Sequence, residues 1–293
     1  MGYQAGGVAE TAAHVQGVTS ESDPEWRLRL QPQRPERLVP FLPARSGPPV
    51  MLLAIPRCGA GSIALFLERL YGPEGVVRDA GVRVNDIFAR RAQPVVSDCL
   101  VVGLPLVRWQ QFCGSAEFQR MTVLRNPWAR IVSHINRLGE IGPERAGPAG
   151  SASRALAEEV ARTDFTSRSG VERFVNRLRL IDVSFDDIQV RMLLTSTMSA
   201  LVKQVLPRDV EAALRELERF ALVGFCEDQL DMQRALLRLT GRQAPVGALF
   251  EGGGRGSVLS PRNAIAREVL LPLYELDQEL YSRARAAFGP RSA

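Results

Sequence analysis

The sequence is almost free of lysine and is poor in histidine and cysteine. Its one lysine is Lys203, its two histidines are His14 and His134, and its four cysteines show no C-x-x-C spacing. Protein metal sites are mostly built from clustered Cys, His and carboxylate side chains, so we expect no metal site. The cysteines suggest no disulfide framework either and are expected to be reduced, intracellular thiols: Cys58, Cys99, Cys113 and Cys226.

Long apolar runs are also missing. No stretch approaches the roughly 20 apolar residues that span a bilayer, and no signal peptide pattern opens the chain. Residues 1–48 are instead rich in Gly, Pro, Ser, Gln and charge, which predicts a flexible or disordered segment. Because 45% of the chain is hydrophobic, residues 49–290 are expected to form a single α/β domain, which we place in the cytoplasm.

Positive charge outweighs negative charge, and arginine supplies almost all of it. The formal net charge is +5 and the pI is about 9.4. This balance favours anionic ligands, such as a nucleotide and an acidic acceptor. The sequence contains neither a dense basic run nor a basic patch interleaved with aromatic residues, so nucleic acid is not an expected partner.

The chain is organised around residues 50–70. An apolar run at 50–55 predicts a buried strand, a loop of small residues follows, and apolar residues at helical spacing then predict a helix. Such a unit directs backbone N–H groups and the positive end of the helix at one point, where a phosphate fits. The candidate phosphate-binding residues are Arg57, Cys58, Gly59, Ala60, Gly61 and Ser62.

This loop differs from a Walker A P-loop, which needs a lysine directly before its Ser or Thr. Gly61 occupies that position before Ser62, so a nucleotide kinase is only a distant third function for this chain. Glycine-containing turns between a strand and a helix are also common in α/β proteins without a ligand. A turn that binds nothing therefore stays open as the alternative.

A second stretch, residues 120–138, has the same strand-to-helix form. Residues 121–124 predict a buried strand, Asn126 is a favourable N-cap and Pro127 fits the first helical position. Arg125 ends the strand, and Ser133 lies eight residues later on roughly the same side of the helix. The two side chains can flank one anion. The alternative is that Arg125 pairs with a surface carboxylate and Ser133 faces solvent.

Predicted strands and helices alternate along the rest of the chain. Residues 72–94 show little periodicity, and the glycine-rich residues 139–150 predict a flexible linker or lid. Helical periodicity predicts helices at 155–162, 171–179, 187–194, from 207 onward, at 229–240 and at 263–288. The alternation predicts one mainly parallel sheet flanked by helices, with both anion sites at its C-terminal edge. Its neighbouring strands are expected at 50–55, 99–103, 121–124 and 221–225.

Both stretches resemble the nucleotide site of sulfotransferases. Their P-K-x-x-x-T-S loop holds the 5′-phosphosulfate of 3′-phosphoadenosine 5′-phosphosulfate (PAPS). Here Pro56 and Ser62 match it, whereas Arg57 replaces the Lys and Gly61 replaces the Thr. Their R-[DN]-P-x-x-R-x-x-S segment holds the 3′-phosphate. That segment is complete in this chain: Arg125, Asn126, Pro127, Arg130 and Ser133.

Three further segments resemble carbohydrate-type (family 2) sulfotransferases, in the same order along the chain. Residues 187–193 are similar to their N-x-Q-x-R-M-L segment, 222–227 to their V-G-x-x-E strand, and 276–288 to their D-x-x-L-Y…F helix. The resemblance implies a P-loop-like three-layer fold, PAPS as co-substrate without a metal, and a hydroxyl acceptor on a glycan or small molecule. Animal members are anchored in the Golgi; this chain lacks that anchor, so we expect a divergent bacterial member.

Sulfuryl transfer needs in-line positioning and positive charge on the departing oxygen. The resemblance implies that Arg57 supplies this charge, although arginine keeps its proton at neutral pH and cannot be a general acid. A hydroxyl acceptor also needs a base. In uronic-acid 2-O-sulfotransferases this base is a His that follows a Gly before the second motif. Here Gly103 is followed by Leu104, which cannot accept a proton.

Other groups are candidates for the missing base. His134 follows Ser133, at a position where relatives often carry a His without a catalytic part. Carboxylates near the expected cleft are the other candidates, and the sequence does not choose among Glu68, Asp79, Asp86 and Asp98. Two functions therefore remain open. One is an active PAPS-dependent sulfotransferase, and the other is a non-catalytic relative that binds the nucleotide or a glycan.

Overall fold

The computed structural model describes residues 41–42, 48–88, 94–112, 118–149, 151–181, 184–195, 204–247 and 257–290. Residues 38–293 belong to one packed unit, which contains all of these ranges. Most of the segment expected to be flexible, residues 1–48, lies outside the described residues, as do His14, Cys113 and Lys203.

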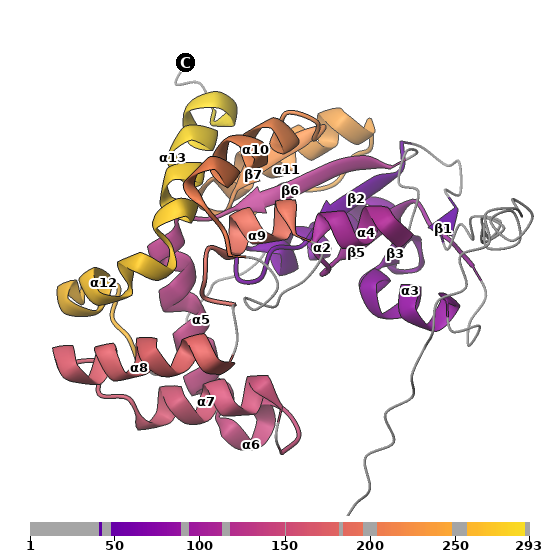
Figure 1. The fold of residues 1–293 in the computed structure, drawn as a ribbon. Helices are drawn as coiled ribbons and strands as arrows, with labels where there is room; N and C mark the ends of the chain where they lie inside the picture. The colour runs from indigo at the N-terminus through magenta and orange to yellow at the C-terminus, as the bar shows by residue number, and fades with distance from the viewer. Residues whose placement is uncertain are drawn as a thin grey trace, which may run out of the picture. The chain divides into compact units, whose positions relative to one another are not determined.

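Five described strands form a parallel sheet in the order β3-β5-β2-β6-β7 (Figure 1). Leu53 at the end of β2 lies opposite Val102 of β5 and Thr122 of β6. This arrangement confirms the predicted set of neighbouring strands. The strands are β2 (Val50–Leu53), β3 (Val76–Val77), β5 (Cys99–Val102), β6 (Gln119–Leu124) and β7 (Leu222–Phe225).

Helices cover both faces of the sheet, which explains why its central strands are apolar on both sides. Met51 and Leu53 pack into one apolar core, whereas Val50 and Leu52 pack into another on the opposite face. The sheet and its two helical layers therefore form a three-layer α/β arrangement. The first face is covered by α3 (Ala80–Phe88), α4 (Leu106–Phe112), α9 (Ile188–Leu194), α10 (Pro207–Leu217) and α13 (Glu275–Phe288), the second by α2 (Ala60–Tyr71) and α11 (Gln229–Thr240).

A third apolar core lies among helices alone and defines what we call the helical lobe. Figure 1 shows α5 leaving the end of β6 and running towards α7 and α8. Trp128 and Ile131 of α5 are buried in this core, so α5 joins the lobe to the C-terminal edge of the sheet. The helices of the lobe are α5 (Pro127–Ile141), α7 (Ala152–Arg162), α8 (Arg168–Ile181) and α12 (Ala264–Leu270).

The domain begins earlier than residue 49. Phe41 and Leu42 lie in the segment expected to be flexible, but they form strand β1 (Phe41–Leu42), which pairs in parallel with β4 (Val95–Val96). Phe41 is buried and stacks on Trp109 with the ring centroids 5.5 Å apart. Burying an aromatic ring offsets the cost of ordering this short segment, which its composition alone does not reveal.

Three predicted segments differ from the structure. Residues 263–288 form two helices instead of one, because Pro272 lacks the N–H that a continuous helix needs and lies in a 3₁₀ turn, η3 (Leu271–Leu273). Residues 139–150 form no simple linker, since α5 continues to Ile141 and α6 (Pro143–Ala146) follows. Residues 72–94 contain a 3₁₀ turn, η1 (Pro73–Gly75), followed by β3 and α3.

The remaining predicted helices are present with boundaries shifted by a few residues. The helix expected at 229–240 is α11, and Gly241 ends it in the left-handed conformation with φ of 66°. A further 3₁₀ turn, η2 (Cys226–Asp228), links β7 to α11. None of the helices in the described ranges is long and apolar enough to cross a bilayer.

Candidate functional site

The loop between β2 and α2 turns sharply at the C-terminal edge of the sheet. Arg57 has φ of 67° and Gly59, the N-cap of α2, has φ of 88°. A side chain at Gly59 would be strained by this backbone and would also meet Cys226, whose Sγ lies 2.9 Å from the Cβ position. Glycine is therefore required there, whereas the exposed Gly61 has open space beside it.

Arg57 reaches across this edge to the helical lobe. Its Nη2 and Nε donate hydrogen bonds to Ser133 Oγ at 2.8 and 3.2 Å. The Arg125 Nη1 donates in turn to the backbone carbonyl of Arg57 at 2.9 Å. The structure therefore brings together the two stretches whose anion sites were both expected at the C-terminal edge of the sheet, although the contacting residues are 68 and 76 positions apart in the sequence.

The start of α5 is fixed by its cap. Asn126 accepts a hydrogen bond from Ala129 N through its side chain at 3.1 Å, as predicted for an N-cap, and Pro127 occupies the first helical position. Glu227, two residues after the end of β7, accepts the Asn126 N–H at 2.9 Å and the Tyr281 hydroxyl at 3.0 Å. The end of β6 is thus tied to η2 and to α13.

Gln189 holds the backbone of Arg125 from both sides. Its Oε1 accepts the Arg125 N–H at 3.0 Å, and its Nε2 donates to the Arg125 carbonyl at 2.9 Å. The buried Cys58 thiol also donates to Gln189 Oε1, at 3.5 Å, and burial raises the pKa of this thiol. Because Gln189 is itself fully buried, it links the loop between β2 and α2 to Arg125 rigidly.

The residues that support the candidate site lie within sequence motifs that resemble the sulfotransferase family, but they were not among the predicted site residues. Their role depends on contacts between segments that lie far apart in the sequence. The order of the motifs along the chain was the one feature of the sequence that could have indicated their role. The residues that support the candidate site in addition to the predicted ones are Gln189, Glu227, Asp277 and Tyr281.

Positive charge accumulates around Arg57. Burial of its guanidinium, followed by the neighbouring positive charges of Arg125 and Arg137, lowers the Arg57 pKa, while Glu140 acts in the opposite sense. An anion placed among these groups would relieve their mutual repulsion and gain charge-assisted hydrogen bonds. The first turn of α2 adds the positive end of a twelve-residue helix, with Ala60, Gly61 and the half-buried Ser62.

Arg130, the second arginine of the R-[DN]-P-x-x-R-x-x-S segment, points into the protein. It is completely buried, and burial lowers its pKa. Its Nη1 donates to the Ser184 carbonyl at 3.0 Å and its Nη2 to the Phe185 carbonyl at 3.5 Å. Arg130 therefore holds the turn before α9 in place and does not line the anion site.

His134 also packs away from the anion site. Its ring lies edge-on to Phe185 with the centroids 4.6 Å apart, and its Nε2 is 3.4 Å from Ser184 Oγ. Burial and the positive charges of Arg130 and Arg57 lower its pKa to about 3. The imidazole is therefore neutral at physiological pH, but these contacts do not direct it towards Arg57 and Ser133.

Leu104 and three of the carboxylates that are candidates for the base lie on or near α2 and α3. A Cβ on Gly81, in the first turn of α3, would lie 2.9 Å from Leu104 Cγ, so this turn packs on the position where the resemblance expects a His. Asp79 directly precedes α3, whereas Asp86 lies two turns further along it. Glu68, which lies on α2, forms an ion pair with Arg78.

Asp98 lies at the opposite edge of the sheet. It precedes β5, its carbonyl accepts the Val50 N–H at 2.8 Å, and its carboxylate is 3.7 Å from Arg242 Nη2. This position is at the N-terminal ends of the strands, away from Arg57. Within the described residues, no group of three or more His, Cys, Asp or Glu could hold a metal ion.

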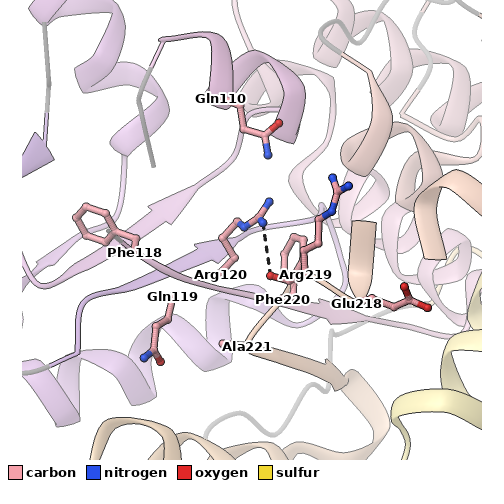
Figure 2. Close-up of a pocket in the computed structure, with 8 residues that line it drawn as sticks. All are labelled: Gln110, Phe118, Gln119, Arg120, Glu218, Arg219, Phe220 and Ala221. Carbon is pink, nitrogen blue, oxygen red and sulfur yellow. Dashed lines mark hydrogen bonds between the residues drawn. The ribbon is translucent and has the colours of Figure 1, made fainter. Parts of the chain in front are cut away.

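An open hollow also lies at the N-terminal edge (Figure 2). Arg120, which lines it, donates to Glu216 Oε1 at 2.6 Å and to the Arg219 carbonyl at 3.5 Å, with its guanidinium over the Phe220 ring. Its charge is therefore paired with a carboxylate, whereas the Arg57 guanidinium donates to the neutral hydroxyl of Ser133. Open α/β sheets bind ligands at the carboxyl ends of their strands, so the Arg57 edge is the candidate site.

Comparisons of this chain with protein-family models, with curated proteins and with solved structures found no match. Its candidate function therefore depends on the residues and geometry of the site. The site comprises a helix N-terminus, Arg57 with two further arginines within electrostatic reach of it, and a serine that accepts hydrogen bonds from Arg57.

Proposed function

We propose that this protein transfers a sulfuryl group from PAPS to a hydroxyl group of a glycan or small-molecule acceptor. The observation that carries the proposal is the direct contact between the two motif stretches, with Arg57 Nη2 2.8 Å from Ser133 Oγ and Arg125 Nη1 2.9 Å from the Arg57 carbonyl. On this proposal the three-layer fold is of the P-loop-like type. The protein acts in the cytoplasm without a metal.

The remaining motif contacts support the same proposal. Gln189, Glu227 and Asp277 come from three separate segments and make hydrogen bonds to Arg125, to Asn126 and to the helix that carries Gln189, respectively. Tyr281 in turn donates to Glu227. Chance matches to short motifs have no reason to meet around one helix N-terminus. A binding site that depends on precise placement needs this kind of supporting network.

Each residue of the site has a role in the proposed reaction. The loop from Cys58 to Ser62 would hold the phosphosulfate through its backbone N–H groups, and Arg125 and Ser133 would hold the 3′-phosphate. Arg57 would stabilise negative charge on the bridging oxygen as the S–O bond to phosphate breaks. Because Ser133 Oγ accepts from Arg57 here, a phosphate at Ser133 would have to share or replace that contact.

A second function has one observation in its favour. Leu104 packs against the first turn of α3 and offers no proton acceptor where the resemblance expects one. A non-catalytic protein that binds the nucleotide or a glycan would need no base. Release of 3′-phosphoadenosine 5′-phosphate (PAP) from PAPS, measured over a panel of sugar and phenol acceptors, separates the two functions. Tight binding of PAP without turnover would favour the second.

Binding of PAP tests the site itself. Replacing Arg125 with Ala removes a charge-assisted contact worth about 1.5–3 kcal/mol, so PAP should bind about ten- to a hundredfold more weakly by titration calorimetry. Arg238→Ala is the control, since Arg238 is exposed near the far end of α11. If the wild type binds adenosine 5′-phosphosulfate as tightly as PAPS, the 3′-phosphate assignment to Arg125 and Ser133 is wrong.

A further inference from the structure

Helix α5 carries another cation one turn beyond Ser133. Arg137 follows Ser133 by four residues, so the two side chains lie on the same side of the helix, about 6 Å apart along its axis. The position of Ser133 is fixed by its hydrogen bonds from Arg57. Arg137 therefore extends the row of polar groups that starts at the phosphate loop.

The present partner of Arg137 is a neighbour on its own helix. Arg137 Nη1 lies 2.9 Å from Glu140 Oε2, and the two side chains are 47% and 46% exposed. An exposed pair of this i,i+3 type contributes little to stability. A phosphate, which offers a higher charge and several acceptor oxygens, can therefore replace the Glu140 carboxylate at small cost.

The charges of Arg137 and Glu140 both act at Arg57, which shows that the two side chains lie near its guanidinium. Arg137 lowers the Arg57 pKa and Glu140 raises it, so both charges act at the guanidinium that contacts Ser133. Arg125 acts on Arg57 in the same sense as Arg137. Both arginines therefore act at Arg57, and Glu140 is the carboxylate that partly offsets their positive charge there.

We propose that Arg137 is a further phosphate-binding residue of this site, which exchanges Glu140 for the 3′-phosphate of the nucleotide and so selects nucleoside 3′,5′-bisphosphates over 5′-monophosphates. The proposal rests on the proposed function, because it takes the same nucleotide as ligand. It makes Arg137 a determinant of ligand selectivity. It also makes Glu140 a competitor of the ligand.

Two variants with opposite expected effects test this inference. Arg137→Gln should weaken binding of PAP about tenfold by titration calorimetry, while adenosine 5′-monophosphate, which lacks the 3′-phosphate, should bind within about twofold of the wild type. Glu140→Gln should strengthen PAP binding about two- to fivefold, because Arg137 then has no carboxylate partner to give up. The affinity for the monophosphate should be unchanged. Both effects should shrink at high salt, since the groups are exposed.

Arg219→Gln is the matched control. Arg219 also forms an i,i+3 ion pair, with Glu216 at 2.7 Å, but it lies at the opposite edge of the sheet (Figure 2). Its loss should change neither affinity. The Arg137 side chain is exposed, so its variant should keep the wild-type melting temperature; should it fail to fold, the Glu140→Gln result decides.

The outcomes separate this inference from the proposed function. A wild-type protein that binds neither nucleotide overturns both. A wild-type protein that prefers PAP, together with an Arg137→Gln variant that keeps the full preference, overturns the role of Arg137 alone. Equal weakening for PAP and the monophosphate would also overturn it, because a contact to the 3′-phosphate cannot act on a ligand that has none.

Discussion

Two buried carboxylates support the helix that carries Gln189. Asp277 accepts the backbone N–H groups of Gln189 and Val190 at the start of α9, both at 2.9 Å, while Asp187 Oδ1 accepts the Asp277 N–H at the start of α13, also at 2.9 Å. Each carboxylate thus accepts hydrogen bonds from backbone N–H groups at the N-terminus of the other's helix, which have no partner within that helix. Asp187 adopts φ of 42°, a conformation that is costly for a residue other than glycine.

Burial raises the pKa of both carboxyl groups, and the positive charge of Arg130 opposes this shift at Asp277. A carboxyl group with a raised pKa in the folded state holds its proton more tightly there than in the unfolded chain. As pH rises from the ordinary carboxyl range through the folded pKa, the unfolded state binds fewer protons than the folded state. The free energy of unfolding therefore falls over this window, and the lost stability is not regained at higher pH.

Asp187→Asn should remove much of this pH dependence. An asparagine Oδ1 can still accept the Asp277 N–H, but it carries no charge that must be buried. We expect the variant to be about 1 kcal/mol more stable than the wild type at pH 8, with the difference shrinking towards pH 5. Urea unfolding at both pH values measures it, with the exposed Asp231→Asn as control. A variant that is less stable than wild type at pH 8 would contradict the argument.

Side-chain direction limits what can be predicted for single residues. Arg57, Arg125 and Ser133 could be predicted because each lies within a local strand-to-helix unit whose backbone fixes its place. Arg130 belongs to the same motif and His134 directly follows it on the same helix, but both contact the turn at 184–185. That turn is about 50 residues away in the sequence, and no local pattern encodes the contact.

At the level of elements, α3 packs beside Leu104, and on the proposed function this bears on which residue is the base. Its first turn contacts Leu104 through Gly81, and Asp79 stands directly before that turn. Arg78 pairs with Glu68. Of the four carboxylate candidates, Asp79 is therefore the one that directly adjoins the turn packed against Leu104, and no ion pair is found for it among the described residues.

Asp79→Asn should lower turnover of a sugar hydroxyl acceptor about a hundredfold or more, because general base catalysis contributes at least that factor. PAP binding should be unchanged. Asp86→Asn is the matched control: it removes the same charge from within α3, seven residues and about 10 Å beyond Asp79. A phenol that is already ionised needs no base and should react equally well with both variants. A similar loss of turnover in both variants would exclude a special role for Asp79.

Element boundaries were predictable where local signals were strong. Asn126 with Pro127 marks the start of α5, and Gly241 marks the end of α11, because caps depend on neighbouring residues. The break at Pro272 was missed although the proline is visible, since apolar periodicity continues on both sides of it. The short helices α3 and α4 were missed because their apolar faces are defined by packing on the sheet.

For the whole molecule, the parallel sheet and the position of the site at its C-terminal edge could be predicted from alternating strands and helices. The division into a sheet core and a helical lobe could not. Trp128 and Ile131 of α5 show ordinary helical periodicity, and nothing in it indicates that they pack on α7, α8 and α12 instead of the sheet. Periodicity predicts that one face of a helix is buried, but it does not predict which element that face packs against.

The site lies where these two parts meet. Arg57 belongs to a loop of the sheet core, and Ser133 belongs to the helix at the centre of the lobe. A ligand that contacts both should stabilise the two parts together. At a hundredfold excess over its dissociation constant, PAP should raise the free energy of unfolding by about 2.7 kcal/mol, which corresponds to roughly 5–10 °C in melting temperature.

Differential scanning calorimetry distinguishes this coupling from local binding. If the sheet core and the lobe unfold as one cooperative unit, a single transition should move upward with PAP, and the shift should shrink in the Arg125→Ala variant at the same ligand concentration. Adenosine 5′-monophosphate, which cannot occupy the Ser133 side, should produce a smaller shift at equal concentration. Two separate transitions of which PAP moves only one would mean that the ligand binds a single part, and that the contact between Arg57 and Ser133 does not bridge the site.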